Sequence, residues 1–476
     1  MRILLISANR ERLPDPVYPI GLASVAAPVV ADGHQVTGID LCFESDPVAS
    51  LRAAVRACAP DIVGIGIRNI DNVNMLDPVW YLPEIRTAVE CVQQEFSGPI
   101  IAGGSGFTLM PREILEYLGL DIGVSGEGEA TFREIVRQVS AGGELGAIPG
   151  VVTRRRREAE APELDPAPVA RIPSLDELPA PFRPLFDLGS YYERGGMANL
   201  QTRRGCPFRC IYCTYPLVEG RRMRLRSPAL VADEMERLGT DFGVRHFYFV
   251  DNVFTYPPKH AVAICEEIVG RNLQVSWGCF GQPHYGGLEL FRLMKRAGCS
   301  GIDFGIDTAV DDGLANMGKN FDAARVAEIT EACREADLPC CHSLLLGGPT
   351  ETAASLAETL RAMEGARPTA VIVGLGIRVY PRTRIQQIAV SEGIVTADSS
   401  YLAPVFYLSP HLDAGCLDIV REAAARNRSW IVPGMGINFS ERIQQRLRGF
   451  GVKGPLWEYF NRIAGNRRRS GRTAYA

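Results

Sequence analysis

Two stretches of the 476-residue chain alternate short apolar runs with amphipathic helical patterns, and this alternation constrains the fold more than any other feature. In the first stretch, residues 1–145, it predicts strands over 3–7, 36–42, 62–67, 99–102 and 122–124. Helical patterns such as 20–31 and 47–58 separate these strands. Apolar strands between helices indicate a parallel sheet covered on both faces, which binds ligands at the carboxyl ends of its strands.

The second stretch, residues 196–400, repeats a strand and a helix about every 30 residues. The predicted strands are 198–202, 246–250, 274–280, 301–306, 342–346 and 371–379. The helical patterns that follow the first five are 228–238, 259–269, 288–297, 323–336 and 353–363. Successive units of this kind build a parallel barrel or part of one, with active residues at the carboxyl ends of the strands.

The remaining segments complete an α/β fold class with three folded parts. Residues 146–195 are rich in proline and are predicted to form an extended connector between the two sheets. Residues 401–476 carry helical patterns at 417–426 and 441–449, which predict a mainly helical C-terminal region. The chain ends in a basic tail, 467–472, which we expect to be solvated; contact with an anionic membrane surface is the alternative.

Three cysteines follow the first strand of the second stretch at C-x3-C-x2-C spacing: Cys206, Cys210 and Cys213. Thiolates are soft ligands that suit iron–sulfur clusters or zinc. Structural zinc takes four protein ligands, but no histidine lies near this loop and the next cysteine is Cys265. Three thiolates would instead leave one iron of a cubane open, which indicates chemistry rather than scaffolding.

Composition narrows the cellular setting. The net charge of −4 gives no global basic field, so we expect no nucleic-acid partner. The N-terminal apolar run stops at Ser7, too short for the apolar region of a signal peptide, and no stretch approaches the roughly 20 apolar residues of a membrane span. Thirteen cysteines without such a signal favour a reducing, cytoplasmic location.

The cysteine run resembles the signature of the radical SAM superfamily, C-x3-C-aromatic-C, with Tyr212 at the aromatic position. The resemblance implies an open (β/α)6 barrel and a [4Fe-4S] cluster on Cys206, Cys210 and Cys213. It also implies that S-adenosylmethionine (SAM) chelates the open iron and is cleaved to a 5′-deoxyadenosyl radical. The electron would come from a donor such as flavodoxin or ferredoxin.

Polar segments at the predicted strand ends resemble further motifs of that superfamily. Asp251-Asn252 resembles the start of D-D-x-F-T, whose place is beside the SAM amino group. Asp307 stands at the acid of G-I-E-S, which contacts the ribose, although Asp is one methylene shorter. The resemblance implies a SAM site made by Tyr212, Asp251, Asn252, Gln282, Asp307 and Arg378, with Arg378 on the SAM carboxylate.

The first stretch resembles the cobalamin-binding domain that precedes many radical SAM barrels. Its first strand lacks the G-x-G-x-x-G of nicotinamide-binding domains. Its later loops are similar to the G-G-x-H and G-E-G-E stretches of the cobalamin-binding family, but the histidine of G-G-x-H and the D-x-H-x-x-G motif are absent. The cobalamin contacts implied are Asn69, Ile70, Asn72, Gly103, Gly104, Ser105, Gly126, Glu127, Gly128 and Glu129.

These resemblances imply a cobalamin-dependent radical SAM enzyme, and methylation of an unactivated carbon is the reaction we expect. The segment 217–224 resembles proteins assigned to lipid or isoprenoid modification, so the expected substrate is small and apolar or lipid-like. Three alternatives stay open: a radical SAM cyclase or rearrangement enzyme without methyl transfer, a methylthiotransferase with a second cluster, and a non-catalytic cobalamin-binding sensor.

Overall fold

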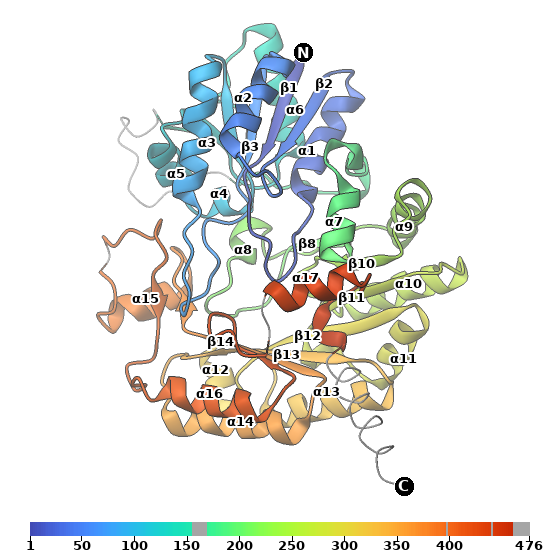
Figure 1. Cartoon of the computed structure of the whole chain (residues 1–476), viewed down its shortest axis with the longest axis vertical. Coiled ribbons are helices and arrows are strands. Elements are labelled where there is room, and N and C mark those ends of the chain that lie inside the picture. The colour runs from blue at the N-terminus through green and yellow to red at the C-terminus, as the bar shows by residue number, and fades with distance from the viewer. Residues whose placement is uncertain (155–168, 397, 439–440, 460–476) are drawn as a thin grey trace.

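The computed structural model describes residues 1–154, 169–396, 398–438 and 441–459. Two sheets dominate these residues, one formed by the N-terminal stretch and one by the middle of the chain. Figure 1 shows the N-terminal sheet in blue at the top and the second sheet in yellow and orange below it. Short segments, including helix α8 (Tyr215–Val218), lie between the two sheets.

The N-terminal sheet has the order β2-β1-β3-β4-β5-β6. Its strands are β1 (Arg2–Ser7), β2 (Gln35–Asp40), β3 (Ile62–Gly66), β4 (Ile100–Gly103), β5 (Ile122–Val124) and β6 (Val151–Thr153). The first five are parallel, as expected, whereas β6 runs antiparallel to β5 and lies within the predicted connector. The sequence patterns did not predict β6, because it lies at the start of the proline-rich segment and is defined by its pairing with β5.

Helices cover both faces of this sheet, because its strands are buried on both sides. Helices α1 (Ile20–Ala31) and α6 (Gly128–Ala141) pack against each other on one face. Helices α2 (Pro47–Cys58) and α3 (Leu82–Glu95) pack together on the other. The short helices α4 (Ser105–Leu109) and α5 (Pro111–Leu118) follow β4. The carboxyl end of β3 points toward the second sheet (Figure 1), and β4 and β5 run parallel to β3.

The second sheet is parallel throughout and has the order β17-β14-β13-β12-β11-β10-β7. Its strands are β7 (Ala198–Leu200), β10 (His246–Phe249), β11 (Ser276–Gly281), β12 (Cys299–Asp307), β13 (Cys340–Leu346), β14 (Ala370–Leu375) and β17 (Trp430–Ile431). The edge strands β7 and β17 do not pair with each other, so the barrel is open. Strand β17 comes from the C-terminal region, which was expected to be helical.

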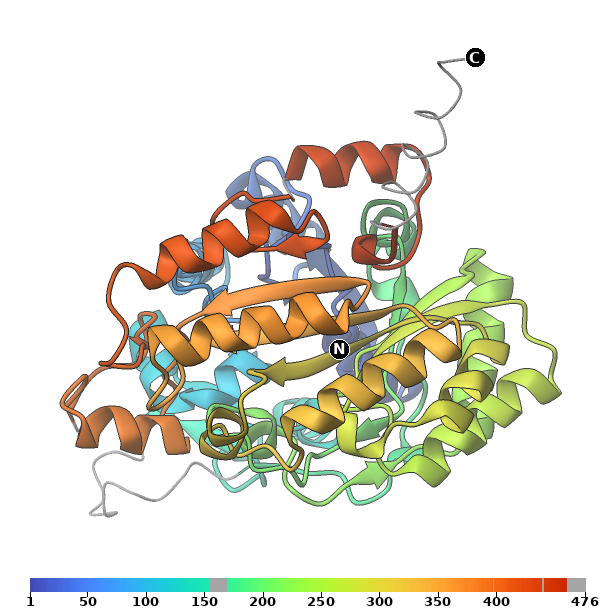
Figure 2. The same cartoon turned by 90° about the horizontal axis from the view of Figure 1, so that it is seen from below.

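Five helices follow the first strands of this sheet: α9 (Pro228–Phe242), α10 (Pro258–Gly270), α11 (Leu288–Arg296), α13 (Ala323–Glu335) and α14 (Ala353–Ala366). Figure 2 shows the yellow-to-orange helices along the outer, convex side of the curved sheet. Apolar side chains at alternate strand positions, such as Ile302 and Phe304, pack beneath them in the main core. The predicted strand 371–379 instead ends at Leu375, and β15 (Ile377–Arg378) pairs with β16 (Phe406–Tyr407).

The C-terminal region crosses the open side of the barrel. Helix α16 (Cys416–Arg426) packs on α14, and α17 (Glu441–Gly449) packs on α7 (Leu188–Gly195). The 3-10 turn Leu456–Tyr459 then brings Trp457 against Cys341 and Ala370 of the second sheet. The basic tail 467–472 lies outside the described residues. None of the helices in the described ranges combines the length and apolar composition needed to cross a bilayer.

Candidate functional site

The cysteine loop follows β8 (Arg203–Arg204) and is held by backbone contacts at each end. Gly205 has a φ of +96°, a conformation that side chains other than glycine rarely adopt. The Cys206 amide donates to Gly220 O at 2.9 Å, and the Ile211 amide donates to Met317 O at 3.1 Å. The loop is therefore anchored to the segment after α8 and to the loop after β12.

The three cysteine thiols lie close enough to influence one another electrostatically. Burial raises the pKa of Cys206 to about 11 and that of Cys213 to about 12. In the described part of the chain, no group of three His, Cys, Asp or Glu side chains converges on a single ion. A cubane places each thiolate on a separate iron, so three soft donors on one loop fit a cluster with one open iron.

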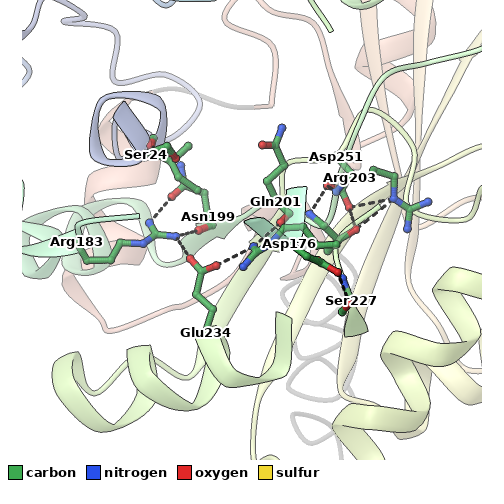
Figure 3. Close-up of polar contacts among 12 residues, drawn as sticks. Ser24, Asp176, Arg183, Asn199, Gln201, Arg203, Ser227, Glu234 and Asp251 are labelled. Carbon is green, nitrogen blue, oxygen red and sulfur yellow. Dashed lines mark hydrogen bonds and ion pairs between the residues drawn. The ribbon is translucent and has the colours of Figure 1, made fainter. Parts of the chain in front are cut away.

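Asp251, at the end of β10, supports the start of the cysteine loop. Its Oδ1 accepts from the Thr202 amide at 2.7 Å, and its Oδ2 accepts from Thr202 Oγ1 at 2.6 Å. Arg203 Nε lies 3.5 Å from Oδ2, and both side chains are fully buried. Figure 3 shows this group beside a second buried network that joins Arg183 to Glu234. Both Asp251 oxygens are thus engaged by the protein, and its contact with SAM stays a prediction.

Asn252 lies next to the loop and carries an unused acceptor. Its Nδ2 donates to Gly205 O at 3.0 Å and to Glu219 Oε2 at 3.3 Å. Its Oδ1 is buried and has no hydrogen-bond partner. Burial raises the pKa of Glu219 to about 7, and the Gly205 amide opposes this by donating to its carboxylate. An orphaned acceptor beside the cysteine loop suits an ammonium donor such as that of SAM.

Tyr212, Asp307 and Lys319 form a buried cluster on the other side of the loop. Tyr212 donates to Asp307 Oδ1 at 3.1 Å, and Lys319 Nζ lies 2.7 Å from Asp307 Oδ2. Asp307 has a φ of +67°, which strains a residue other than glycine and indicates a functional constraint. Burial raises the pKa of Asp307, and Lys319 opposes that rise. The sequence analysis assigned no role to Lys319.

Gln282 and Arg378 are both tied to protein groups. Gln282 accepts from the His284 amide at 2.8 Å and donates to Asn320 Oδ1. Arg378 Nε donates to Asp71 Oδ2 at 2.8 Å, and its other nitrogens donate to backbone carbonyls, including Tyr401 O at 2.7 Å. Arg378 therefore joins the two sheets in this structure, and its contact with the SAM carboxylate stays a prediction.

The loops at the carboxyl end of the N-terminal sheet form a backbone cradle. Gly104 has a φ of +107°, and a Cβ there would lie 2.5 Å from Ile67 O. A Cβ at Gly106 would lie 2.9 Å from Arg68 O, and Ser105 Oγ donates to the same carbonyl at 2.8 Å. Arg68 Nε is buried without an acceptor. Gly104 and Ser105 are exposed, so this turn presents its backbone to a bulky ligand such as the corrin.

The other predicted cobalamin contacts lie in the loop after β3 or at the ends of β4 and β5. Asn72 shapes its own loop, since its Oδ1 accepts from the Val79 amide at 3.0 Å and its Nδ2 donates to Asp77 O at 2.7 Å. Ile70 is buried and Asn69 is half-buried beside it. Gly103 lies at the end of β4, and Gly126 and Gly128 at the turn after β5. Their contacts with cobalamin stay predictions.

Glu127 and Glu129 point away from their own sheet, toward the cysteine loop. Arg204 Nη2 lies 2.5 Å from Glu129 Oε1, and Arg224 Nη2 lies 2.5 Å from Glu127 Oε1. All four side chains are buried. Sequence reasoning missed Arg204 and Arg224 as partners, although the position of Arg204 two residues before Cys206 was a signal. The two glutamates thus connect the N-terminal sheet to the segments on either side of the cysteine loop, and their contacts with cobalamin stay predictions.

Comparisons with known proteins match this architecture. A model of the radical SAM superfamily matches residues 200–363, and a model of the B12 binding domain matches residues 6–136. An uncharacterised methyltransferase of Pyrococcus horikoshii is 27% identical over 402 residues, which cover 83% of this chain and 84% of that protein. Tryptophan 2-C-methyltransferase of Streptomyces laurentii is 26% identical over 434 residues, covering 78% and 72%.

A solved structure has the same fold over nearly the whole chain. The radical SAM methyltransferase TsrM of Kitasatospora setae, solved with cobalamin and a [4Fe-4S] cluster bound, superposes with a TM-score of 0.84. The match covers 99% of both chains at 23% sequence identity. The arrangement of a cobalamin-type sheet over an open parallel barrel is therefore shared by both proteins.

Proposed function

Because the chain belongs to the radical SAM superfamily and carries a B12-binding domain, we propose that it moves a methyl group from SAM, by way of cobalamin, to a carbon of a small-molecule substrate. Its cofactors are a [4Fe-4S] cluster, SAM and cobalamin. Bound cobalamin supplies a methyl carrier, and the cluster supplies the electron for reductive cleavage of SAM. The electron donor, flavodoxin or ferredoxin, stays a prediction.

One observation carries the proposal: buried ion pairs tie the turn after β5, at the carboxyl end of the N-terminal sheet, to the segments on either side of the cysteine loop. Cys206, Cys210 and Cys213 would hold the cluster. Residues 67–72 and 103–106 would receive the corrin at the carboxyl end of the N-terminal sheet. The Glu129–Arg204 ion pair would help to hold these two regions at a constant separation. Methyl transfer between two cofactors requires such a fixed separation, because reaction rates fall steeply with misplacement.

The residues of the chain have separate tasks in this proposal. Asn252 Oδ1 would accept from the SAM ammonium, and Asp307 would accept from the ribose hydroxyls. Lys319, buried beside Asp307, keeps a positive charge next to the cysteine loop. Asp251 holds the first turn of that loop through Thr202.

The test is anaerobic incubation of the reconstituted enzyme with methyl-labelled SAM, a reductant, cobalamin and candidate substrates. We expect label in a product whose mass has increased by one CH2, and no such product from the Cys210→Ala variant. Label that never reaches any substrate, from protein that carries both cofactors, contradicts the proposal.

A cyclase is the second candidate, supported by three relatives that carry the same cyclase name. The anaerobic magnesium-protoporphyrin IX monomethyl ester cyclase of Cereibacter sphaeroides is 29% identical over 329 residues, covering 65% of this chain and 50% of that protein. Product mass separates the two reactions, because cyclisation adds no CH2. An apolar or lipid-like substrate, as the sequence predicts, is compatible with either reaction.

A further inference from the structure

The inner face of the second sheet carries a carboxylate that the reaction described above does not use. Along β12, Ile302, Phe304 and Ile306 face the outer helices and pack in the main core. The alternate positions therefore face the inside of the barrel. At one end of this inner row, a Cβ on Gly301 would lie 2.7 Å from the ring of Trp457; at the other end is Asp307, bonded to Tyr212.

Asp303 lies between these two ends, four residues before Asp307. A parallel strand rises about 3.3 Å per residue, so Asp303 lies about 13 Å below the acid of the predicted ribose site. Trp457 closes the inner face beneath it. Asp303 therefore lies toward the closed end of the barrel interior, and the cysteine loop lies at the opposite end.

The neighbours of Asp303 on this face are largely apolar. Phe280 of β11 is its direct register partner, and Cys341 is its partner on β13. Ser343 Oγ donates to Asp303 Oδ1 at 2.8 Å, and Ile372 of β14 is the register partner of Ser343. Phe280 is 39% exposed and meets Tyr248 of β10 edge-on, with ring centroids 5.4 Å apart. The ring of Phe280, which lies beside the Asp303 carboxylate, is therefore accessible to solvent.

Within the described residues, no ion pair compensates the charge of Asp303. It is 6% exposed, forms no ion pair, and its Oδ2 receives no hydrogen bond. The neighbouring His342 points the other way, toward Thr330 and Met363. Burial raises the pKa of Asp303 to about 6, and the Ser343 hydroxyl and the nearby His342 ring partly offset that rise. Buried carboxylates are costly unless they are paired, so this one has capacity for a donor from a ligand.

We propose that Asp303 and Ser343 are the polar anchor of the substrate site, and that the substrate carries an N–H donor on a flat apolar body. The donor is a protonated amine or a heteroaromatic N–H, which bonds Asp303 Oδ2. The flat body lies against Phe280 and Tyr248, which also suit a cation through their ring faces. This inference rests on the proposed function and narrows the substrate from an apolar molecule to an amphipathic nitrogen compound.

The test measures binding of simple probes to the anaerobic holoenzyme by calorimetry. Indole and phenethylamine each supply an N–H donor on a ring, and 1-methylindole is the matched probe without the donor. We expect indole to bind the wild type at least about 10-fold more tightly than 1-methylindole does. In Asp303→Asn this preference should fall below about 3-fold, and phenethylamine binding should weaken about 10-fold or more.

Two further variants keep the result interpretable. Ser343→Ala removes the hydroxyl beside Asp303 and should weaken indole binding less than Asp303→Asn does. Asp241→Asn changes an exposed carboxylate on α9 and should leave both probes unaffected. Thermal unfolding of Asp303→Asn should be unchanged or shifted upward, because the substitution removes a buried charge.

Each outcome bears on one proposal. A donor preference that survives Asp303→Asn, or a wild type without any preference, overturns the inference. Consumption of labelled SAM with cobalamin and reductant, measured on the same preparations without probe, tests the proposed function separately. A wild type that consumes SAM but binds the probes indifferently retains the function and loses the substrate assignment.

Discussion

Glu129, at the start of α6, and Arg204, two residues before the first cysteine of the loop, form a buried ion pair between the two sheets at 2.5 Å. Glu127 adds a second carboxylate 3.5 Å from Arg204 and a contact with Arg224. Because the pair links the cobalamin-type sheet to the cluster loop, the position of one cofactor region depends on the other. Because the planar guanidinium of Arg204 contacts two carboxylates, its orientation relative to both is fixed.

Breaking this pair should loosen the cysteine loop. Glu129→Ala leaves Arg204 partly uncompensated in a buried position, which should cost about 3 kcal/mol of stability. We expect lower iron content and altered electron paramagnetic resonance of the reduced cluster. Glu134→Ala, on the same helix but in an exposed pair with Arg137, is the matched control and should change neither. Equal effects of the two variants would refute the assignment.

The Arg378–Asp71 pair should act on stability more than on SAM binding. Both side chains are buried, with Arg378 Nε 2.8 Å from Asp71 Oδ2. Asp71→Ala and Arg378→Ala should each cost about 3–5 kcal/mol, because each leaves the partner charge unpaired. Arg86→Ala, which breaks the exposed pair with Glu90, should cost less than about 1 kcal/mol.

Denaturation of these variants and SAM titration of the folded proteins together decide the role of Arg378. A variant at Arg378 that loses SAM affinity while Asp71→Ala keeps it would support the role predicted from the sequence. Parallel losses of stability with unchanged SAM affinity would support the link between the two sheets.

Each of the three loop cysteines should be necessary for the cluster. Reconstituted wild type should hold about four irons and four sulfides per chain, and Cys206→Ala should hold far fewer. Cys265→Ala is the control, since Cys265 is a buried core thiol on α10. Iron and sulfide analysis gives the answer. Four irons retained without Cys206, or a second cluster remaining, would instead favour a methylthiotransferase.

The glycine cradle should tolerate no side chain at Gly104. Gly104→Ala places a methyl group 2.5 Å from Ile67 O at a φ of +107°, so it combines strain with a clash. Gly119→Ala is the matched control: its φ is +66° and nothing lies within 4 Å. The control should cost about 1–2 kcal/mol from backbone strain alone, and Gly104→Ala more. The absorbance of cobalamin retained after gel filtration should fall for Gly104→Ala only.

Asp303→Asn should stabilise the protein in a pH-dependent way. Burial raises the pKa of Asp303 from 3.8 to about 6, so the folded state holds its proton more tightly than the unfolded state. Stability is therefore lost as pH rises from about 4 to about 6, and the loss is complete above that range. At pH 7.5 the variant should exceed the wild type by at most about 3 kcal/mol, and the difference should vanish near pH 4. Thermal melts at both values test this.

Much of the fold could be predicted from the sequence. The patterns gave α1, α2, β5 and α17 with the bounds that the structure has, because each element shows its own local period or cap. Strands β6 and β17 were missed, since they lie in segments with proline-rich or helical patterns and their pairing depends on segments far along the chain.

The candidate site divides in the same way. The sequence placed Tyr212 and Asp307 at one end of the barrel, and the structure brings them within 3.1 Å. The sequence also placed Asp251 and Arg378 at strand ends. It could not reveal that Asp251 is hydrogen-bonded to Thr202 and Arg378 to Asp71. Spacing shows where a side chain is attached, whereas its partner depends on what packs opposite.

The sequence by itself determined the order of strands and helices and the spacing of three thiols on one turn, because both arise from neighbours a few residues apart. Only the tertiary structure decided that Glu129 meets Arg204 across 75 residues and that Asp303 faces the barrel interior without a counter-charge. Those relationships depend on the packing of two sheets and on the register of β12 against its neighbours, which no local pattern encodes.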